Sequence, residues 1–190
     1  GIGFDDQTNR LVIPIHDRKG SLVNAKLYAP ADHDGPKMIW TVSGVGGNYL
    51  YPSRAWSEPW VILVEGETDV ITLRGYGFPA CSGTAGAGDP VPEGDWWRGK
   101  TVFVLMDIDE AGLEATEKAI YRMRELASSI IKVELPDWPG RPEKADPSDY
   151  VQYLKNQGLD SMAIQSALGS MLERGERLEG SDSSLDTEPV

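Results

Sequence analysis

The sequence predicts an α/β protein built on a four-stranded, mainly parallel sheet flanked by helices. Between residues 61 and 135, short apolar runs alternate with segments of helical periodicity, which is the pattern of a parallel sheet covered on both faces. A segment that reads as a β-hairpin precedes this region and predicts a small mixed α+β lobe. Two further helical patterns follow it and predict C-terminal helices.

The amino-terminal lobe is expected to span residues 1–60. Residues 10–29 predict two strands on either side of a turn at residues 17–20. Residues 30–60 are rich in Gly, Pro, Trp and Tyr, which predicts irregular chain or short strands.

The main sheet is expected within residues 61–136. Its four predicted strands are residues 61–64, 78–82, 101–106 and 130–135, and its helices are residues 68–76 and 111–127. Residues 137–172 predict a helical segment, with helices at 146–158 and 160–172. The acidic, aperiodic residues 173–190 predict a disordered tail or linker.

The composition indicates a protein of a reducing, cytoplasmic compartment. A single cysteine, Cys81, allows neither an internal disulfide nor a zinc cluster within the chain. The apolar runs are too short for a transmembrane helix, and residues 1–10 lack the pattern of a signal peptide. We therefore expect no contact with a membrane.

The net charge of −12 at first argues against a nucleic-acid partner. However, residues 1–60 carry equal numbers of basic and acidic side chains, and the excess of carboxylates lies beyond them. Divalent cations bound among those carboxylates would reverse the local field. The charge therefore leaves nucleic-acid binding open.

Acidic side chains follow three of the predicted strands. They are Glu65, Glu67 and Asp69 after the first strand, Asp107 and Asp109 after the third, and Asp146 and Asp149 after the fourth. The carboxyl ends of parallel strands meet at one edge of a sheet, where ligands bind. Carboxylates gathered there repel one another unless a cation lies between them, and Mg²⁺ prefers such oxygen ligands. The pattern predicts a site for Mg²⁺, with Mn²⁺ as a substitute.

Each acidic group also has an ordinary structural explanation. An Asp-x-Asp after a strand is often a solvated turn, and residues 65–69 also suit a capped helix start. Residues 146–149 suit a helix N-terminus equally well. The cation site is favoured because all three groups fall on one predicted edge.

Two motifs resemble the Toprim domain, the catalytic module of bacterial-type primases, type IA and II topoisomerases and some nucleases. They are VILVEGETD at residues 61–69 and FVLMDIDEAG at residues 103–112. In that family a Glu after the first strand and a DxD after the third form the Mg²⁺ site, and Glu65, Asp107 and Asp109 stand at these positions. Gly66, Asp69 and Gly112 also match the family pattern.

The flanking segments resemble the RNA-polymerase core of bacterial and phage-type DNA primases. RLVIPIHDRKGSLVNAKLY, followed by PKMIW and YLYP, is similar to its amino-terminal subdomain, and LPDWPGRPEKADPSDYV is similar to the stretch after Toprim. Topoisomerases lack the leading hairpin, so the primase branch fits better. The chain departs from the family in lacking the cysteines of a zinc module and a P-loop, and in carrying Ser148 where an acidic residue is common.

The resemblance implies a nucleotidyltransferase that synthesises short RNA primers on single-stranded DNA during replication, in the cytoplasm of a bacterial cell or a phage-infected host. Asp107, Asp109 and Asp146 would hold Mg²⁺ on the incoming nucleoside triphosphate, and Glu65 would complete the site or accept a proton. Asp69 and Asp149 would lie next to these ligands and hold them in place without binding the metal themselves. Basic side chains would hold template and triphosphate; these are Arg10, Lys26 and Lys37, although Lys26 also suits an exposed solubilising role. A replicative helicase is a further expected partner.

Two alternatives remain open from the sequence. One is a Toprim nuclease that uses the same metal site to cleave phosphodiesters. The other is a non-catalytic module that binds DNA or a replication protein. The leading hairpin argues against the first, and the retention of all three motif carboxylates argues against the second.

Overall fold

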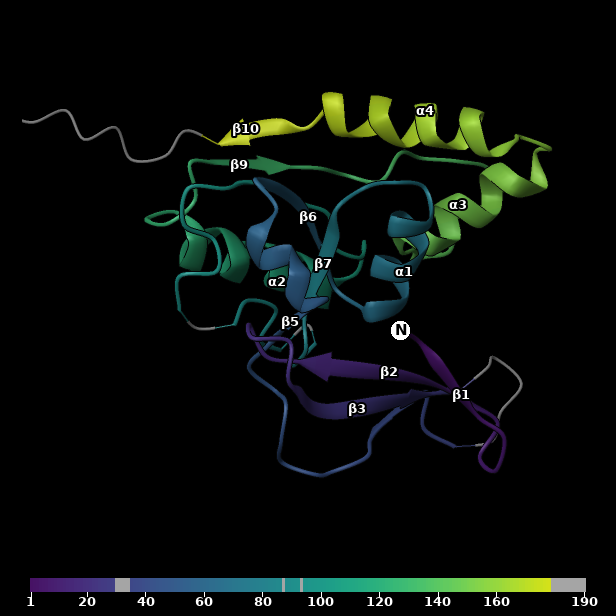
Figure 1. Ribbon diagram of the computed structural model, residues 1–190. Coiled ribbons are helices and arrows are strands. Elements are labelled where there is room, and N and C mark those ends of the chain that lie inside the picture. Colours follow the sequence, from purple (N-terminus) through teal and green to yellow (C-terminus); the bar gives the residue numbers. More distant parts are fainter. Residues whose placement is uncertain (30–34, 87, 93, 179–190) are drawn as a thin grey trace, which may run out of the picture.

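The computed structural model describes residues 1–29, 35–86, 88–92 and 94–178, which form two sheets with helices around the second (Figure 1). The first sheet is antiparallel, with strand order β1-β2-β3-β4. Its strands are β1 (Gly3–Asp5), β2 (Arg10–His16), β3 (Leu22–Tyr28) and β4 (Met38–Trp40). The predicted turn between β2 and β3 is present: Gly20 has a φ of 82°, and the Asp17 carboxylate accepts the backbone N–H groups of Lys19 and Ser21.

The second sheet has six strands in the order β10-β9-β8-β6-β7-β5. They are β5 (Leu50–Tyr51), β6 (Trp60–Val64), β7 (Ala80–Gly83), β8 (Thr101–Val104), β9 (Ser129–Lys132) and β10 (Glu176–Leu178). β6 pairs in parallel with β7 and β8, and β8 pairs in parallel with β9, whereas β5 and β10 are antiparallel edge strands. The predicted mixed α/β fold is confirmed, with two more strands in this sheet than expected.

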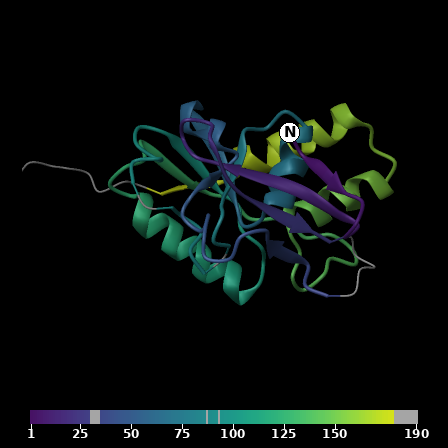
Figure 2. The same cartoon turned by 60° about the horizontal axis from the view of Figure 1, so that its bottom comes forward.

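Helices cover both faces of the second sheet (Figures 1 and 2). They are α1 (Glu67–Gly75), α2 (Glu110–Met123), α3 (Pro147–Asn156) and α4 (Ser161–Glu173), with a short 3₁₀ helix, η1 (Ser53–Ser57). Successive residues of β6 alternate between the faces: Ile62 and Val64 pack with α1, α3 and α4, whereas Val61 and Leu63 pack with α2. This two-sided burial explains why the strand is a continuous apolar run. None of the helices in the described ranges is long and apolar enough to cross a membrane.

The prediction of a disordered tail from residue 173 is wrong for its first residues. α4 continues to Glu173, and β10 pairs with β9 through Glu176–Lys132, Arg177–Ile131 and Leu178–Ile130. Gly175 makes this return possible, because a Cβ there would lie 2.5 Å from Ile131 Cγ2. Three residues are too few for strand periodicity to be recognised. The remainder of the predicted tail, residues 179–190, lies outside the described residues.

Candidate metal and nucleotide site

Five acidic residues gather at the carboxyl end of the parallel strands, and we call them the acidic edge. They are Glu65 after β6, Asp69 in the first turn of α1, Asp107 and Asp109 after β8, and Asp146 at the start of α3. Burial, followed by the charges of the other four carboxylates, raises the pKa of Asp107 to about 8. The three strand-end groups predicted from the sequence are therefore brought together.

Two carboxylate oxygens of the acidic edge are buried without a hydrogen-bond partner among the described residues. They are Glu65 Oε2 and Asp107 Oδ1. Burial also raises the pKa of Glu65, as does the charge of Asp109. An unsatisfied buried oxygen costs roughly 1–3 kcal/mol, and more when it is charged. A bound cation would remove this cost at both oxygens.

Asp109 and Asp146 each cap a helix. Asp109 Oδ1 accepts the Gly112 N–H of α2 at 2.9 Å, and this bond, more than the nearby Lys144, lowers the pKa of Asp109. Asp146 Oδ1 accepts the Asp149 N–H of α3 at 2.7 Å, and the Asp149 carboxylate accepts the Asp146 N–H in return. The helix-cap explanation and the convergence at one edge therefore both hold. The caps fix these two carboxylates in place.

Gly112 also has a structural reason that the sequence alone does not reveal. A Cβ at this position would lie 2.1 Å from the carbonyl oxygen of Asp107. Glycine is therefore needed for the first turn of α2 to lie against the loop that carries both aspartates.

Asp69 joins α1 to the start of α3. Its Oδ1 accepts bonds from the Ser148 N–H at 3.2 Å and the Ser148 hydroxyl at 2.6 Å, and Thr72 Oγ1 lies 3.0 Å from Ser148 Oγ. Burial, followed by the charge of Asp146, raises the pKa of Asp69 to about 7. Ser148, which stands where an acidic residue is common in primases, thus serves Asp69 as a hydrogen-bond donor.

Lys26 and Glu67 form a buried ion pair between the two sheets. Lys26 Nζ on β3 lies 2.5 Å from Glu67 Oε1 on α1, and the side chains are 8% and 3% exposed. Lys26 is therefore not an exposed charge, and its ammonium is already paired. Glu67, predicted among the acidic residues of the cation site, instead pairs with Lys26, and nothing in a spacing of 41 residues signals this contact.

Arg10 and Lys37 differ in how far they are available to a ligand. Arg10 is buried, and its Nη1 donates to the carbonyl oxygens of Leu27 at 3.3 Å and Pro36 at 3.0 Å. Lys37 is exposed, and its charge opposes the burial that raises the pKa of Glu65 and of Asp146. Among the three predicted basic residues, Lys37 is thus the one that faces the acidic edge with a free approach from solvent.

The donors of the acidic edge are chemically suited to Mg²⁺ or Mn²⁺. Within the described ranges, no three acidic, histidine or cysteine side chains lie close enough together to make a ready ligand cage. Mg²⁺ is commonly held by one or two carboxylates together with waters and substrate phosphates, so a complete cage is not required. The two unpartnered oxygens at Glu65 and Asp107 fit this kind of site.

The chain is similar in sequence to a bacterial DNA primase. No family model matches it. It is 27% identical over 184 residues to a DNA primase of Enterococcus faecalis (strain ATCC 700802 / V583), which covers 86% of this chain. The chain spans 28% of the length of that relative.

The fold is similar to those of solved primase structures. The Aquifex aeolicus primase (zinc-binding and RNA polymerase domains) matches 89% of this chain and 41% of its own, at a TM-score of 0.63 and 24% identity. A chain in the structure of the bacteriophage T7 lagging-strand DNA polymerase interacting with primase domains of two gp4 subunits bound to an RNA/DNA hybrid and dTTP is also similar. It matches 93% of this chain and 83% of its own, at a TM-score of 0.62 and 17% identity. The predicted resemblance to a Toprim primase core is confirmed in sequence and fold.

Proposed function

We propose that this chain is the catalytic core of a DNA primase, which joins ribonucleotides on a single-stranded DNA template and requires Mg²⁺. The observation that carries the proposal is a pair of buried oxygens, Glu65 Oε2 and Asp107 Oδ1, at the ligand-binding edge of the sheet, which have no hydrogen-bond partner among the described residues. The similarity to primases supports it. In this proposal β7, β6, β8 and β9 are the Toprim sheet of a domain at residues 61–136, between an amino-terminal subdomain at 1–60 and a helical segment at 137–172.

The acidic edge would hold the metal and position the reacting groups. Mg²⁺ bound there would supply positive charge to neutralise the triphosphate. Asp107, Asp109 and Asp146 are its proposed ligands, the last two held by their helix caps. Glu65 completes the site or accepts the proton of the hydroxyl, because a carboxylate with a raised pKa is a better base. Asp69 and Asp149 keep the start of α3 in place.

The three basic residues would have different roles. Lys37 is exposed near the acidic edge and would contact the triphosphate or template backbone. Arg10 would act by holding the Pro36 carbonyl, and therefore the segment that carries Lys37. Lys26 would act through Glu67, by holding α1 against β3. Single-stranded DNA, nucleoside triphosphates and a replicative helicase are the proposed partners.

A primer-synthesis assay tests the proposal. The protein is supplied with single-stranded DNA, labelled ribonucleotides and Mg²⁺ or Mn²⁺, on unprimed and primed templates. The Asp107→Ala/Asp109→Ala variant should lose at least about a hundredfold in rate, because the charge stabilisation in the transition state is lost. Asp160→Ala is the matched control, since Asp160 caps α4 away from the acidic edge. Oligonucleotides that persist in the double variant would overturn the mechanism.

The same assay separates the two alternatives. A Toprim nuclease would cleave the DNA in a metal-dependent way without synthesis. A binding module would retain DNA without metal and would show neither reaction.

A further inference from the structure

A cavity of about 480 Å³ lies between the amino-terminal sheet and α1, apart from the acidic edge. Its walls come from the end of β2, from η1 and from the second half of α1. Pro14, Pro52, Val70 and Ile71 give it apolar surfaces, and Arg54, Arg74 and His16 are its basic residues. None of the acidic edge lines it, and none of its described lining residues is acidic. This volume is that of a pocket for a small organic molecule.

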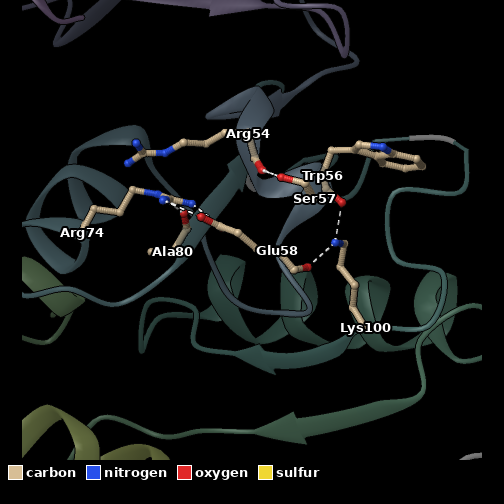
Figure 3. Close-up of polar contacts among 7 residues, drawn as sticks. All are labelled: Arg54, Trp56, Ser57, Glu58, Arg74, Ala80 and Lys100. Atoms are coloured by element: carbon tan, nitrogen blue, oxygen red, sulfur yellow. Dashed lines mark hydrogen bonds and ion pairs between the residues drawn. The ribbon is translucent and has the colours of Figure 1, made fainter.

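The two arginines of the cavity differ in their pairing, because the Glu58 carboxylate binds Arg74 alone among the described residues. Arg74 donates from Nη1 and Nη2 to both oxygens of Glu58, at 2.9 Å and 2.6 Å, and from Nε to the Ala80 carbonyl at 2.7 Å. Its charge is therefore balanced and its orientation fixed. Arg54 extends above it with its guanidinium free of any hydrogen bond or ion pair drawn in Figure 3, and only its backbone carbonyl accepts a bond, from Ser57.

A guanidinium beside a second, already paired guanidinium favours an anion. An anionic ligand would pair with the Arg54 guanidinium, and a phosphoryl group matches the planar donors of arginine in a bidentate contact. Tyr51 also lines the cavity, and burial raises the pKa of its hydroxyl, which therefore stays protonated and able to donate. The polar side of the cavity thus offers donors and a net positive charge.

The apolar residues of the cavity indicate a ligand that carries a group able to pack against them, in addition to a phosphate. Two prolines and two aliphatic side chains present a surface on which a flat base or a sugar can lie. We propose that this cavity binds a nucleoside diphosphate, with its phosphates on Arg54 and its nucleoside against Pro14, Pro52, Val70 and Ile71. The site is distinct from the acidic edge and needs no metal ion.

Calorimetric titration of the whole chain with ADP, in the presence of EDTA, tests this site. EDTA removes divalent cations and therefore suppresses metal-dependent binding at the acidic edge. Wild type should bind ADP, and Arg54→Ala should weaken binding about tenfold or more, since a charge-assisted bidentate contact is lost. Arg98→Ala, which removes an exposed arginine outside the cavity, should leave the affinity unchanged.

Two further arms identify the chemistry and the location. Pyrophosphate should bind more weakly than ADP, and adenosine should not bind measurably. Asp107→Ala/Asp109→Ala should bind ADP as wild type does, even if primer synthesis proves absent from this protein. The proposal is overturned if wild type does not bind ADP at millimolar concentration, if Arg54→Ala binds it equally well, or if the double aspartate variant loses it. Equal affinity for pyrophosphate and ADP would overturn the nucleoside part.

Discussion

Replacing Lys26 with methionine would break the buried ion pair between the two sheets and should strongly destabilise the protein. The side chains of Lys26 and Glu67 are 8% and 3% exposed, so the substitution leaves the Glu67 carboxylate in a poorly solvated site without its cation. Loss of one member of a buried pair typically costs about 3–5 kcal/mol. We therefore expect the free energy of unfolding to fall by about that amount for Lys26→Met.

Urea unfolding followed by tryptophan fluorescence measures this loss. Lys118→Met is the matched control, because Lys118 pairs with Glu114 at 3.7 Å on the surface of α2, where both side chains are about half exposed or more. Such a pair contributes less than about 0.5 kcal/mol. The Lys26→Met/Glu67→Met variant should recover much of the stability lost by the single substitution, since no uncompensated charge remains.

The double variant also decides whether Lys26 acts through Glu67 or through a ligand. If Lys26 only holds α1 in place, primer synthesis should recover along with stability in the double variant. If the free energy of unfolding of Lys26→Met lies within about 1 kcal/mol of that of wild type, the reasoning is refuted. Such a loss is below the cost expected for an unpaired buried charge. Strictly additive effects of the two single substitutions would also refute it.

Two further predictions concern the acidic edge and its supports, and a third concerns the contacts of Arg18. In metal-free buffer, the free energy of unfolding should fall as pH rises from about 4 to about 8, because Asp107 has a pKa of about 8 when folded against 3.8 ordinarily, so the native state holds the extra proton. Asp107→Asn or added Mg²⁺ should flatten this decline, and a decline of unchanged slope in Asp107→Asn would contradict the assignment. Gly112→Ala should lower thermal stability by several degrees or prevent folding, because its Cβ would meet the Asp107 carbonyl, whereas Gly169→Ala in α4 has open space and should be neutral or stabilising. Arg18→Ala should cost about 1–2 kcal/mol in urea unfolding, since the guanidinium lies 3.6 Å and 4.2 Å from the ring centroids of Trp56 and Trp96 and pairs with Asp95 at 2.7 Å; an unchanged midpoint would show that the cluster contributes nothing.

Local patterns were sufficient to predict the main elements of the second sheet. β6 is buried on both faces and β8 is buried on one face and half-buried on the other, so their apolar runs are recognisable. Helices such as α3 carry their capping residues in sequence. Short edge strands were not predictable, because β5 and β10 exist only by pairing with β7 and β9. Their residues have too little periodicity to signal this partnership.

At the acidic edge, too, features set by local sequence were predictable and features set by tertiary contacts were not. The convergence of Glu65, Asp107 and Asp146 follows from strand order, which the sequence reveals. The burial of Arg10 and the pairing of Lys26 do not, because they depend on where the first sheet docks on the second. The family resemblance predicted that both would hold template and triphosphate. Only the tertiary contacts distinguish a supporting cation from an available one such as Lys37.

The acidic edge contains two kinds of carboxylate, and the difference explains how such a site survives folding. Asp109 and Asp146 are held by backbone N–H groups of helix N-termini, where the helix dipole and the capping bonds stabilise a negative charge. Glu65 and Asp107 each retain a buried oxygen with no partner in the described part of the chain, and burial raises their pKa values. Asp109 can therefore stay ionised and fixed without metal, whereas burial raises the pKa of Asp146 despite its cap. Asp146 and the unpartnered pair thus take up protons more readily until a cation arrives. Protonation of the buried carboxylates allows the protein to fold before a metal ion binds. Cations then compete with protons for these carboxylates, so metal affinity should increase with pH up to about 8.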